Sequence, residues 1–228
     1  TENYQIINYN RNFKTGYIKL QIMQLLTAAG TFNRTILELK LKSKIEWTDY
    51  TWNPVWGCNA GCDYCYAKDI SKRFASVIAA KETNEKINQL NIEKRLKNFE
   101  PTFIWTHFQN FRFPEKPSRI FIGSMSDIAF WKPEWIDMVA DVIRYYPQHT
   151  FQLLTKFPGV YEMLDEIMPA NVWFGVTVTR ISELDKLIVA HNQGRNWYIS
   201  FEPLLEDLQG KIYDSDLHMF DWVIIGTM

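Results

Sequence analysis

Six short apolar segments recur along this chain, and most are followed by a segment whose apolar residues have helical spacing. The segments are nearly continuous in β-branched and aromatic residues, which is typical of strands buried on both faces of a parallel sheet. The predicted strands cover residues 51–56, 119–123, 150–156, 171–178, 197–202 and 221–226. The predicted helices cover residues 66–80, 84–98, 133–146, 160–168 and 182–190, the last beginning at Ser182.

The alternation predicts an α/β fold with a parallel sheet. Repeated right-handed crossovers produce either an incomplete (β/α)6 barrel similar to a TIM barrel or an open doubly wound sheet, and the strand pattern leaves both open. The chain stops at Met228, directly after the sixth strand, without a helix to cover that strand, and it begins without Met. We therefore expect a chain truncated after the sixth strand.

Two regions differ in composition from the regular alternation. Residues 1–44 carry seven Lys and Arg against Glu2 and Glu38, so we expect a basic N-terminal extension over residues 1–43, poorly ordered or weakly docked. The partial barrel is then predicted to cover residues 44–228. Residues 81–118 are first charged and then aromatic and proline-rich, and we interpret them as an insertion.

Charge and hydropathy restrict the environment and the partners. The formal net charge of −1 indicates no general attraction to phosphates, so a nucleic-acid substrate is possible but is not indicated. No apolar run approaches the roughly 20 residues that span a bilayer, and no secretory signal is present, so no membrane partner is expected. Three clustered cysteines fit a reducing compartment, and we predict a cytoplasmic protein. The aromatic content of 15%, with nine Trp, indicates a large core or a cavity with stacking surfaces.

All three cysteines lie in one short loop between the first predicted strand and the first predicted helix. They are Cys58, Cys62 and Cys65, with the spacing C-x3-C-x2-C. Three thiols cannot all pair as disulfides, but three thiolates can hold a metal or an iron–sulfur cluster and leave one coordination position open. The alternative is a structural zinc site, which needs a fourth ligand. A histidine from elsewhere in the chain could supply it, and the candidates are His107, His149, His191 and His218.

Other polar residues occur where predicted strands end. Ligands of parallel α/β folds bind at the carboxyl ends of the strands, because the loops there gather polar groups from separate units. This rule selects Ser124, Ser126, Asp127, Thr155, Lys156, Thr177, Thr179, Ser200 and Glu202. For Asp127 the equal alternative is a helix cap or a solvated loop carboxylate. For Lys156 the favoured alternative is a surface residue. Glu202 lies between apolar residues and Pro203, an unusual place for a carboxylate without a function.

The cysteine loop resembles the signature loop of the radical S-adenosylmethionine (radical SAM) superfamily, with Tyr64 in the aromatic position before the last cysteine. Over residues 44–228 the sequence also resembles an uncharacterised phage-associated family within or close to that superfamily. The similar phrases are KIEWT at 44–48, TWNP at 51–54, FIGSMSD at 121–127, LTK at 154–156 and SFEPL at 200–204.

The resemblance implies a [4Fe–4S] cluster held by Cys58, Cys62 and Cys65, with S-adenosylmethionine bound to the fourth iron. An electron donor such as a flavodoxin or ferredoxin would reduce the cluster. Cleavage of the cofactor would give a 5′-deoxyadenosyl radical that abstracts hydrogen from an unknown substrate. No catalytic residue of the protein is predicted beyond these ligands.

The resemblance also suggests which residues orient the cofactor. In the superfamily the loop after the second strand binds the cofactor amino group, often through Gly-Gly-Glu. Here that loop reads Gly-Ser-Met-Ser-Asp, so the candidates are Ser124, Ser126 and Asp127. Tyr64 would lie over the adenine edge, Thr177 and Glu202 are candidates for ribose or substrate, and Thr155 and Lys156 for substrate. The alternative function is a non-enzymatic zinc- or Fe–S-binding phage accessory module whose basic arm docks a partner.

Overall fold

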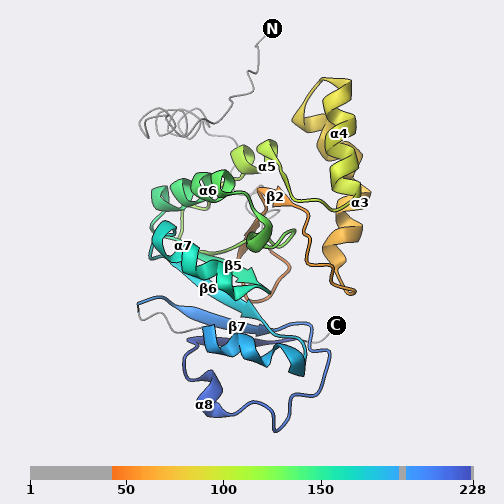
Figure 1. Ribbon diagram of the computed structural model, residues 1–228. Helices are drawn as coiled ribbons and strands as arrows, with labels where there is room; N and C mark the ends of the chain where they lie inside the picture. Colours follow the sequence, from red (N-terminus) through yellow and green to blue (C-terminus); the bar gives the residue numbers. More distant parts are fainter. Residues whose placement is uncertain (1–42, 190–193, 227–228) are drawn as a thin grey trace.

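A computed structural model describes residues 43–189 and 194–226 (Figure 1). The predicted basic extension, apart from Ser43, lies outside the described residues. The centre of the fold is a six-stranded sheet in which every neighbouring pair is parallel. Its strands, in spatial order, are β1 (Tyr50–Trp52), β4 (Arg119–Ile122), β5 (Thr150–Thr155), β6 (Val172–Thr177), β7 (Trp197–Phe201) and β8 (Trp222–Ile225). The predicted α/β class and parallel sheet are confirmed.

The strand order runs in one direction along the chain. Going across the sheet from β1 to β8, the strands follow one another in the order in which they occur along the chain. The direction of this order does not reverse at any point in the sheet. A doubly wound sheet needs such a reversal, so that alternative does not describe this sheet. Within the described residues, β1 and β8 form the two edges and are not paired with each other.

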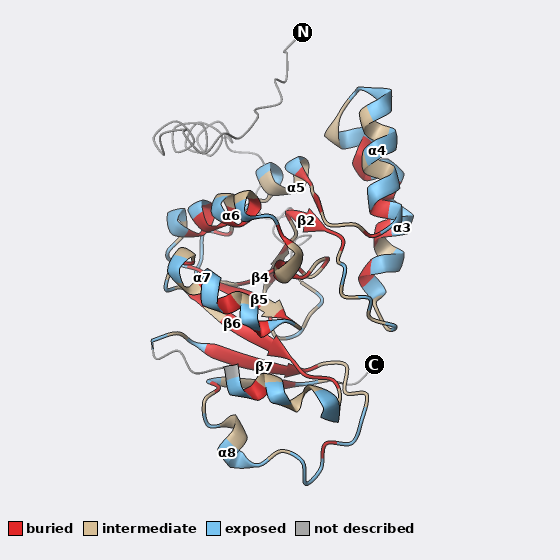
Figure 2. Cartoon of the chain, viewed as in Figure 1, coloured by how far each residue is buried: buried red, intermediate tan, exposed pale blue. Residues whose placement is uncertain are grey.

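One face of the sheet is covered by helices. Alternate strand residues such as Ile120, Phe151 and Phe174 form one apolar cluster with residues of α6 (Pro133–Tyr145) and α7 (Tyr161–Ile167). The amphipathic pattern of α6 explains this placement, because its buried residues recur at helical spacing from Trp135 to Ile143. Figure 2 shows the strands buried almost throughout, while the outward sides of these helices are exposed.

The opposite face, here called the inner face, is arranged in layers by the strand register. The layer nearest the carboxyl ends contains Thr177, Ser200 and Ile224. The middle layer contains Leu154, Gly175, Tyr198 and Trp222. The lowest layer contains Thr51, Phe121, Gln152 and Trp173. Residues of neighbouring strands therefore lie side by side across this face.

Pro54 divides the first predicted strand. The structure has β1 and then a separate β2 (Val55–Trp56), which pairs antiparallel with β3 (Thr102–Phe103) in a second, small sheet. The prediction of a single strand over 51–56 is wrong, because Pro54 cannot donate to a ladder. Its carbonyl instead accepts a hydrogen bond from the Ile104 backbone N–H at 2.8 Å.

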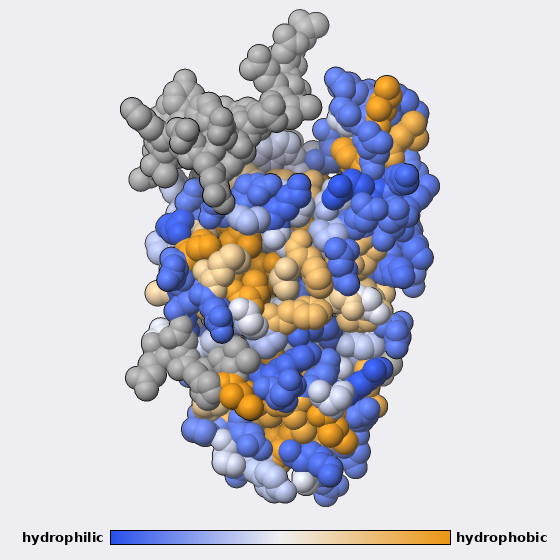
Figure 3. All heavy atoms as spheres, viewed as in Figure 1, coloured by the Kyte–Doolittle hydropathy of each residue, from blue (hydrophilic) through white to orange (hydrophobic). Residues whose placement is uncertain are grey.

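The region predicted as an insertion lies beside the cysteine loop. After α3 (Tyr66–Glu82) it contains α4 (Lys86–Lys97), β3 and α5 (Trp105–Asn110). Helices α3 and α4 pack against each other beside the sheet (Figure 1). Figure 3 shows apolar side chains at the outer end of this pair, where Ile87 and Leu90 are exposed.

The remaining elements are short. The predicted α-helix over 182–190 is a 3₁₀-helix, η3 (Ile181–Val189). Thr179, two residues before it, is held by the Glu183 carboxylate, which accepts from the Thr179 backbone N–H. Two further 3₁₀-helices are η1 (Ile128–Phe130) and η2 (Pro158–Val160), and α8 (Asp214–Leu217) was not predicted. No helix in the described part of the chain is long and apolar enough to span a membrane.

The middle layer predicts a steric test. A methyl group added at Gly175 would lie 2.2 Å from the Tyr198 ring, whereas one added at Gly159 would have no heavy atom within 4 Å. We expect Gly175→Ala to lower the free energy of unfolding by about 1–3 kcal/mol in urea denaturation, and Gly159→Ala to change it by less than about 0.5 kcal/mol. Equal effects of the two substitutions would contradict this account of the layer.

Candidate functional site

The cysteine loop is fixed to its neighbours by its first residues. Gly57 has a φ of +97°, and a Cβ there would lie 2.2 Å from the Glu100 carbonyl oxygen. This position therefore requires glycine. The Gly57 N–H donates to the Met125 carbonyl at 3.0 Å, and the Cys58 N–H donates to the Phe99 carbonyl at 2.9 Å. The loop is thereby held between the insertion and the loop that follows β4.

Asn53 positions the loop after β4. Its side-chain oxygen accepts from the Ser124 hydroxyl at 3.1 Å and from the Met125 N–H at 3.3 Å. The Tyr66 hydroxyl donates to the Ser124 carbonyl at 2.8 Å, which joins this loop to the start of α3. In the same loop, the Ser126 hydroxyl accepts from the Trp131 indole N–H at 3.0 Å. Sequence reasoning did not identify Asn53, although it lies in one of the quoted phrases.

Asp127 is buried, and its carboxylate accepts three hydrogen bonds. Its carboxylate accepts from the Thr155 hydroxyl at 2.6 Å, the Lys156 N–H at 2.9 Å and the Ala129 N–H at 3.0 Å. The last bond makes it the N-cap of η1, which was the alternative weighed for this residue. Asp127 therefore joins the ends of β4 and β5. The Thr155 hydroxyl also accepts from the Phe157 N–H at 3.0 Å, so it too serves this junction.

Lys156 extends toward the cysteine loop rather than into solvent. Its ammonium group donates to the Tyr64 hydroxyl at 2.6 Å and lies 5.0 Å from the Tyr64 ring centroid. The Tyr64 hydroxyl in turn lies 3.5 Å from the Thr179 hydroxyl. The ends of β5 and β6 thus hold the residue that precedes the last cysteine. The alternative reading of Lys156 as a surface residue does not fit these contacts.

The side chains chosen from the sequence lie around one cavity. Its volume is about 940 Å³. The predicted residues that line it are Cys58, Cys62, Tyr64, Cys65, Ser124, Ser126, Asp127, Thr155, Lys156, Thr177, Ser200 and Glu202. Thr179 is the one strand-end residue selected above that does not line it. Because these side chains come from five strand ends, the cavity lies at the carboxyl edge of the sheet.

The three thiols are free and half-buried. Burial raises the pKa of the Cys58 thiol to about 12, against the opposing hydrogen bond from the Ala60 N–H. Among residues 43–189 and 194–226, no three His, Cys, Asp or Glu side chains are grouped closely enough to hold a metal ion. The thiols therefore share the cavity without converging on one point.

One feature beside the thiols favours negative charge and opposes the burial that raises the pKa of Cys58. Helix α3 begins directly after Cys65, and no side chain caps its N-terminus. The N–H groups of its first turn and the positive end of its dipole therefore favour thiolates beside it. A [4Fe–4S] cluster bound through three thiolates fits this donor set, because three cysteines on one loop open into one cavity.

Trp47 completes the far wall of the cavity and was not predicted from the sequence. Its indole N–H donates to the Glu202 carboxylate at 3.0 Å. Glu202 reaches this position because residue 226 is glycine: a Cβ there would lie 2.3 Å from a Glu202 carboxylate oxygen. The carboxylate singled out in the sequence is thus held by a residue far away in the chain.

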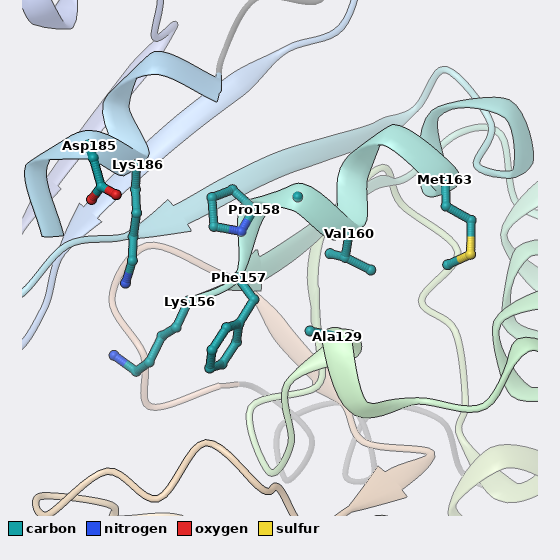
Figure 4. A pocket seen from close by; sticks show the side chains of 9 residues that line it. Ala129, Lys156, Phe157, Pro158, Val160, Met163, Asp185 and Lys186 are labelled. Carbon is teal, nitrogen blue, oxygen red and sulfur yellow. The ribbon is translucent and has the colours of Figure 1, made fainter.

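A second pocket of about 700 Å³ adjoins the first, and Lys156 lines both. Its other residues come from the segment after β5, from α7, from Ala129 and from η3 (Figure 4). In Figure 4 the side chains of Lys156 and Lys186 both lie on the side of the pocket away from Met163. The ammonium group of Lys186 donates to Glu183 at 2.9 Å. Lys156 therefore lies at the boundary between the two pockets.

The sequence model of one family, described as a protein of unknown function (DUF5131), matches residues 42–227 of the chain. No curated protein and no solved structure matches it.

Glu183 provides a pH-dependent test of the support behind Tyr64. Burial opposes its ionisation, but hydrogen bonds from Lys186 and from the Thr179 N–H and hydroxyl outweigh it and hold the pKa of Glu183 at about 2. Since this pKa lies below the ordinary value of 4.5, the carboxylate stabilises the fold above pH 4.5, and the stabilisation is lost as the pH falls toward 2. We expect Glu183→Gln to lower the Tm at pH 7, and the difference from wild type to shrink between pH 4.5 and 2. A difference that does not vary with pH would contradict the assignment.

Proposed function

The chain belongs to the DUF5131 family of proteins of unknown function, and we propose that it is a radical SAM enzyme. The observation that carries the proposal is the opening of all three thiols of the C-x3-C-x2-C loop into one cavity. The same cavity is lined by polar residues from the other strand ends. A thiol set used only to stabilise the fold has no need of a large cavity beside it.

The sheet supports the same proposal. Six parallel strands in unbroken chain order are the arrangement of an incomplete (β/α)6 barrel, the fold expected from the resemblance. The cysteine loop comes after β1, the first strand of this order, with only the short β2 between them, and in the superfamily it also follows the first strand. We propose that the sheet is such a partial barrel, with the cavity at its carboxyl edge.

In this proposal Cys58, Cys62 and Cys65 hold a [4Fe–4S] cluster. When bound, the cluster and S-adenosylmethionine supply a one-electron cleavage that yields a 5′-deoxyadenosyl radical for hydrogen abstraction. The role of the protein is to bind and orient the cluster and the cofactor and to shield them from water. The uncapped start of α3 stabilises the thiolate charge, and the packed loop around Gly57 keeps the cysteines at the cavity wall. An electron donor such as a flavodoxin or ferredoxin is required.

The loop after β4 would receive the cofactor amino group. A protonated amine needs oxygen acceptors, and this loop provides the Ser124 and Ser126 hydroxyls beside the Asp127 carboxylate. Asp127 already accepts three hydrogen bonds, so its main role is to hold this loop against β5. About one acceptor site of the carboxylate remains for the amine. The Asn53 side chain holds this loop through its hydrogen bonds to Ser124 and Met125. This arrangement would replace the Gly-Gly-Glu motif of the superfamily.

The remaining wall residues would orient the rest of the cofactor and the substrate. Tyr64, held by Lys156, is the residue proposed to lie over the adenine edge. Thr177 and Glu202 line the same cavity and are the candidates to bind ribose hydroxyls or substrate. Lys156 also faces the adjoining groove, which makes it the candidate for an anionic part of the substrate.

The proposal predicts reductive cleavage of the cofactor. We expect protein reconstituted anaerobically with iron and sulfide, then reduced with S-adenosylmethionine present, to form 5′-deoxyadenosine. Cys62→Ala should reduce product to background, because two thiolates no longer hold the cluster. Ser76→Ala, at an exposed position on α3, should leave it unchanged. Chromatography with mass detection measures the product.

Metal analysis separates the alternative function. Stoichiometric zinc without iron in protein purified under nitrogen, together with no 5′-deoxyadenosine after reconstitution, would favour a non-enzymatic zinc-binding accessory module instead. Retained product formation in Cys62→Ala would also refute the proposal.

A further inference from the structure

Three polar side chains on the inner face of the sheet have buried groups without hydrogen-bond partners among the described residues. They are the Ser200 hydroxyl, the Tyr198 hydroxyl and both amide atoms of Gln152. The side chains are 0%, 0% and 1% exposed, respectively. Buried polar groups in native proteins are almost always paired, and each unpaired one costs about 1–3 kcal/mol. Three on one face therefore call for an explanation.

The register places these three residues on a descending path. Ser200 lies in the layer nearest the carboxyl ends and lines the large cavity. Tyr198 lies in the middle layer, where its ring crosses Gly175 toward β5. Gln152 lies in the lowest layer, between Phe121 and Trp173. We call these three residues the polar track. It leads from the cavity into the inner face of the sheet.

Flat aromatic rings surround the polar track. The Trp47 ring centroid lies 4.8 Å from that of Phe121, 6.0 Å from Tyr198 and 6.5 Å from Trp222. Trp222 also meets Trp173 edge to face at 6.5 Å. Every residue of the two lower layers is uncharged. The Arg119 guanidinium lies 5.8 Å from the Trp222 ring centroid at the margin of this face, where it pairs with Asp49. A ligand on the two lower layers themselves would therefore be held by stacking and hydrogen bonds.

Trp47 differs from the other rings because it does not belong to the sheet. It precedes β1 and occupies the inner face with a planar bicyclic ring, about the size of a purine. One side-chain hydrogen bond, to Glu202, holds its indole nitrogen. Trp47 thus packs on Phe121 and Tyr198 beside the polar track, and no hydrogen bond joins it to the track residues.

We propose, on the premise of the function above, that the inner face binds a nucleobase as the reacting substrate, and that the base displaces Trp47. The Gln152 amide presents a donor and an acceptor side by side, which complements the edge of a base. The Tyr198 and Ser200 hydroxyls can each donate or accept. Aromatic rings stack on either face of a base regardless of sequence. A nucleoside and a base extruded from a nucleic acid share this chemistry.

The first test is binding to cluster-free protein without S-adenosylmethionine. Adenosine, guanosine, cytidine and thymidine are titrated separately, with calorimetry and tryptophan fluorescence as readouts. We expect at least one nucleoside to bind saturably and to shift the emission as Trp47 leaves the inner face. Gln152→Leu should weaken that binding by about tenfold or more. The same change at exposed Gln209 should leave it unaltered.

Two variants separate recognition from folding. Gln152→Leu should raise the Tm, because it removes two buried atoms without partners, so weaker binding in this variant cannot be ascribed to unfolding. Trp47→Ala should bind the nucleoside at least as tightly as wild type, since the competing ring is absent. A lower Tm for Gln152→Leu, or weaker binding by Trp47→Ala, would overturn the proposal.

A short single-stranded oligonucleotide of the preferred base distinguishes the two sources. Affinity about tenfold or more above the nucleoside assigns the base to a nucleic acid, and equal or lower affinity assigns it to a free nucleoside. No saturable binding of any nucleoside or oligonucleotide, or binding unchanged in Gln152→Leu, would refute the inference. This result is independent of 5′-deoxyadenosine formation, so failure of the nucleobase site and failure of radical SAM chemistry are distinguishable.

Discussion

The buried carboxylate of Asp127 is the contact on which the geometry of the site depends. A charge in this position is tolerated because three donors, from Thr155, Lys156 and Ala129, surround it. These bonds set the loop after β4 against the end of β5. The Met125 carbonyl of that loop accepts a hydrogen bond from the Gly57 N–H, so the same contact also determines the position of the cysteine loop. Two strand ends and the thiols therefore form one unit.

The two faces of the sheet are used differently. On the helix-covered face the buried Tyr161 hydroxyl is paired: it donates to the Gly175 carbonyl at 2.7 Å and accepts from the Gly175 N–H at 3.1 Å, although the buried Trp197 indole N–H on that face has no partner among the described residues. On the inner face Tyr198, one strand away, has no such partner. A fold that pairs one tyrosine and leaves the other unpaired is giving up stability on the inner face. Such local exceptions are expected where a ligand completes the contacts.

Much of the fold and part of the site follow from sequence pattern. Continuous apolar segments predicted the strands β4 to β8, and the carboxyl-end rule predicted that Ser124, Thr177 and Glu202 would share a cavity with the cysteines. Pattern could not predict the contacts made across long distances in the chain. Trp47 and Glu202 are 155 residues apart, and Asn53 and Ser124 are 71 apart. Periodicity identifies a face of a strand, but it does not identify what lies opposite that face.

Trp47 links the inner face of the sheet to the cavity that the thiols line. Its ring covers the inner face, while its indole nitrogen holds the Glu202 carboxylate, which faces the thiols' cavity. If a base displaces the ring, Glu202 loses this donor at the moment the substrate arrives. The carboxylate would then be available to the cofactor or the substrate only in the loaded state. A reactive radical benefits from such coupling, because the site is filled and water is excluded before cleavage begins.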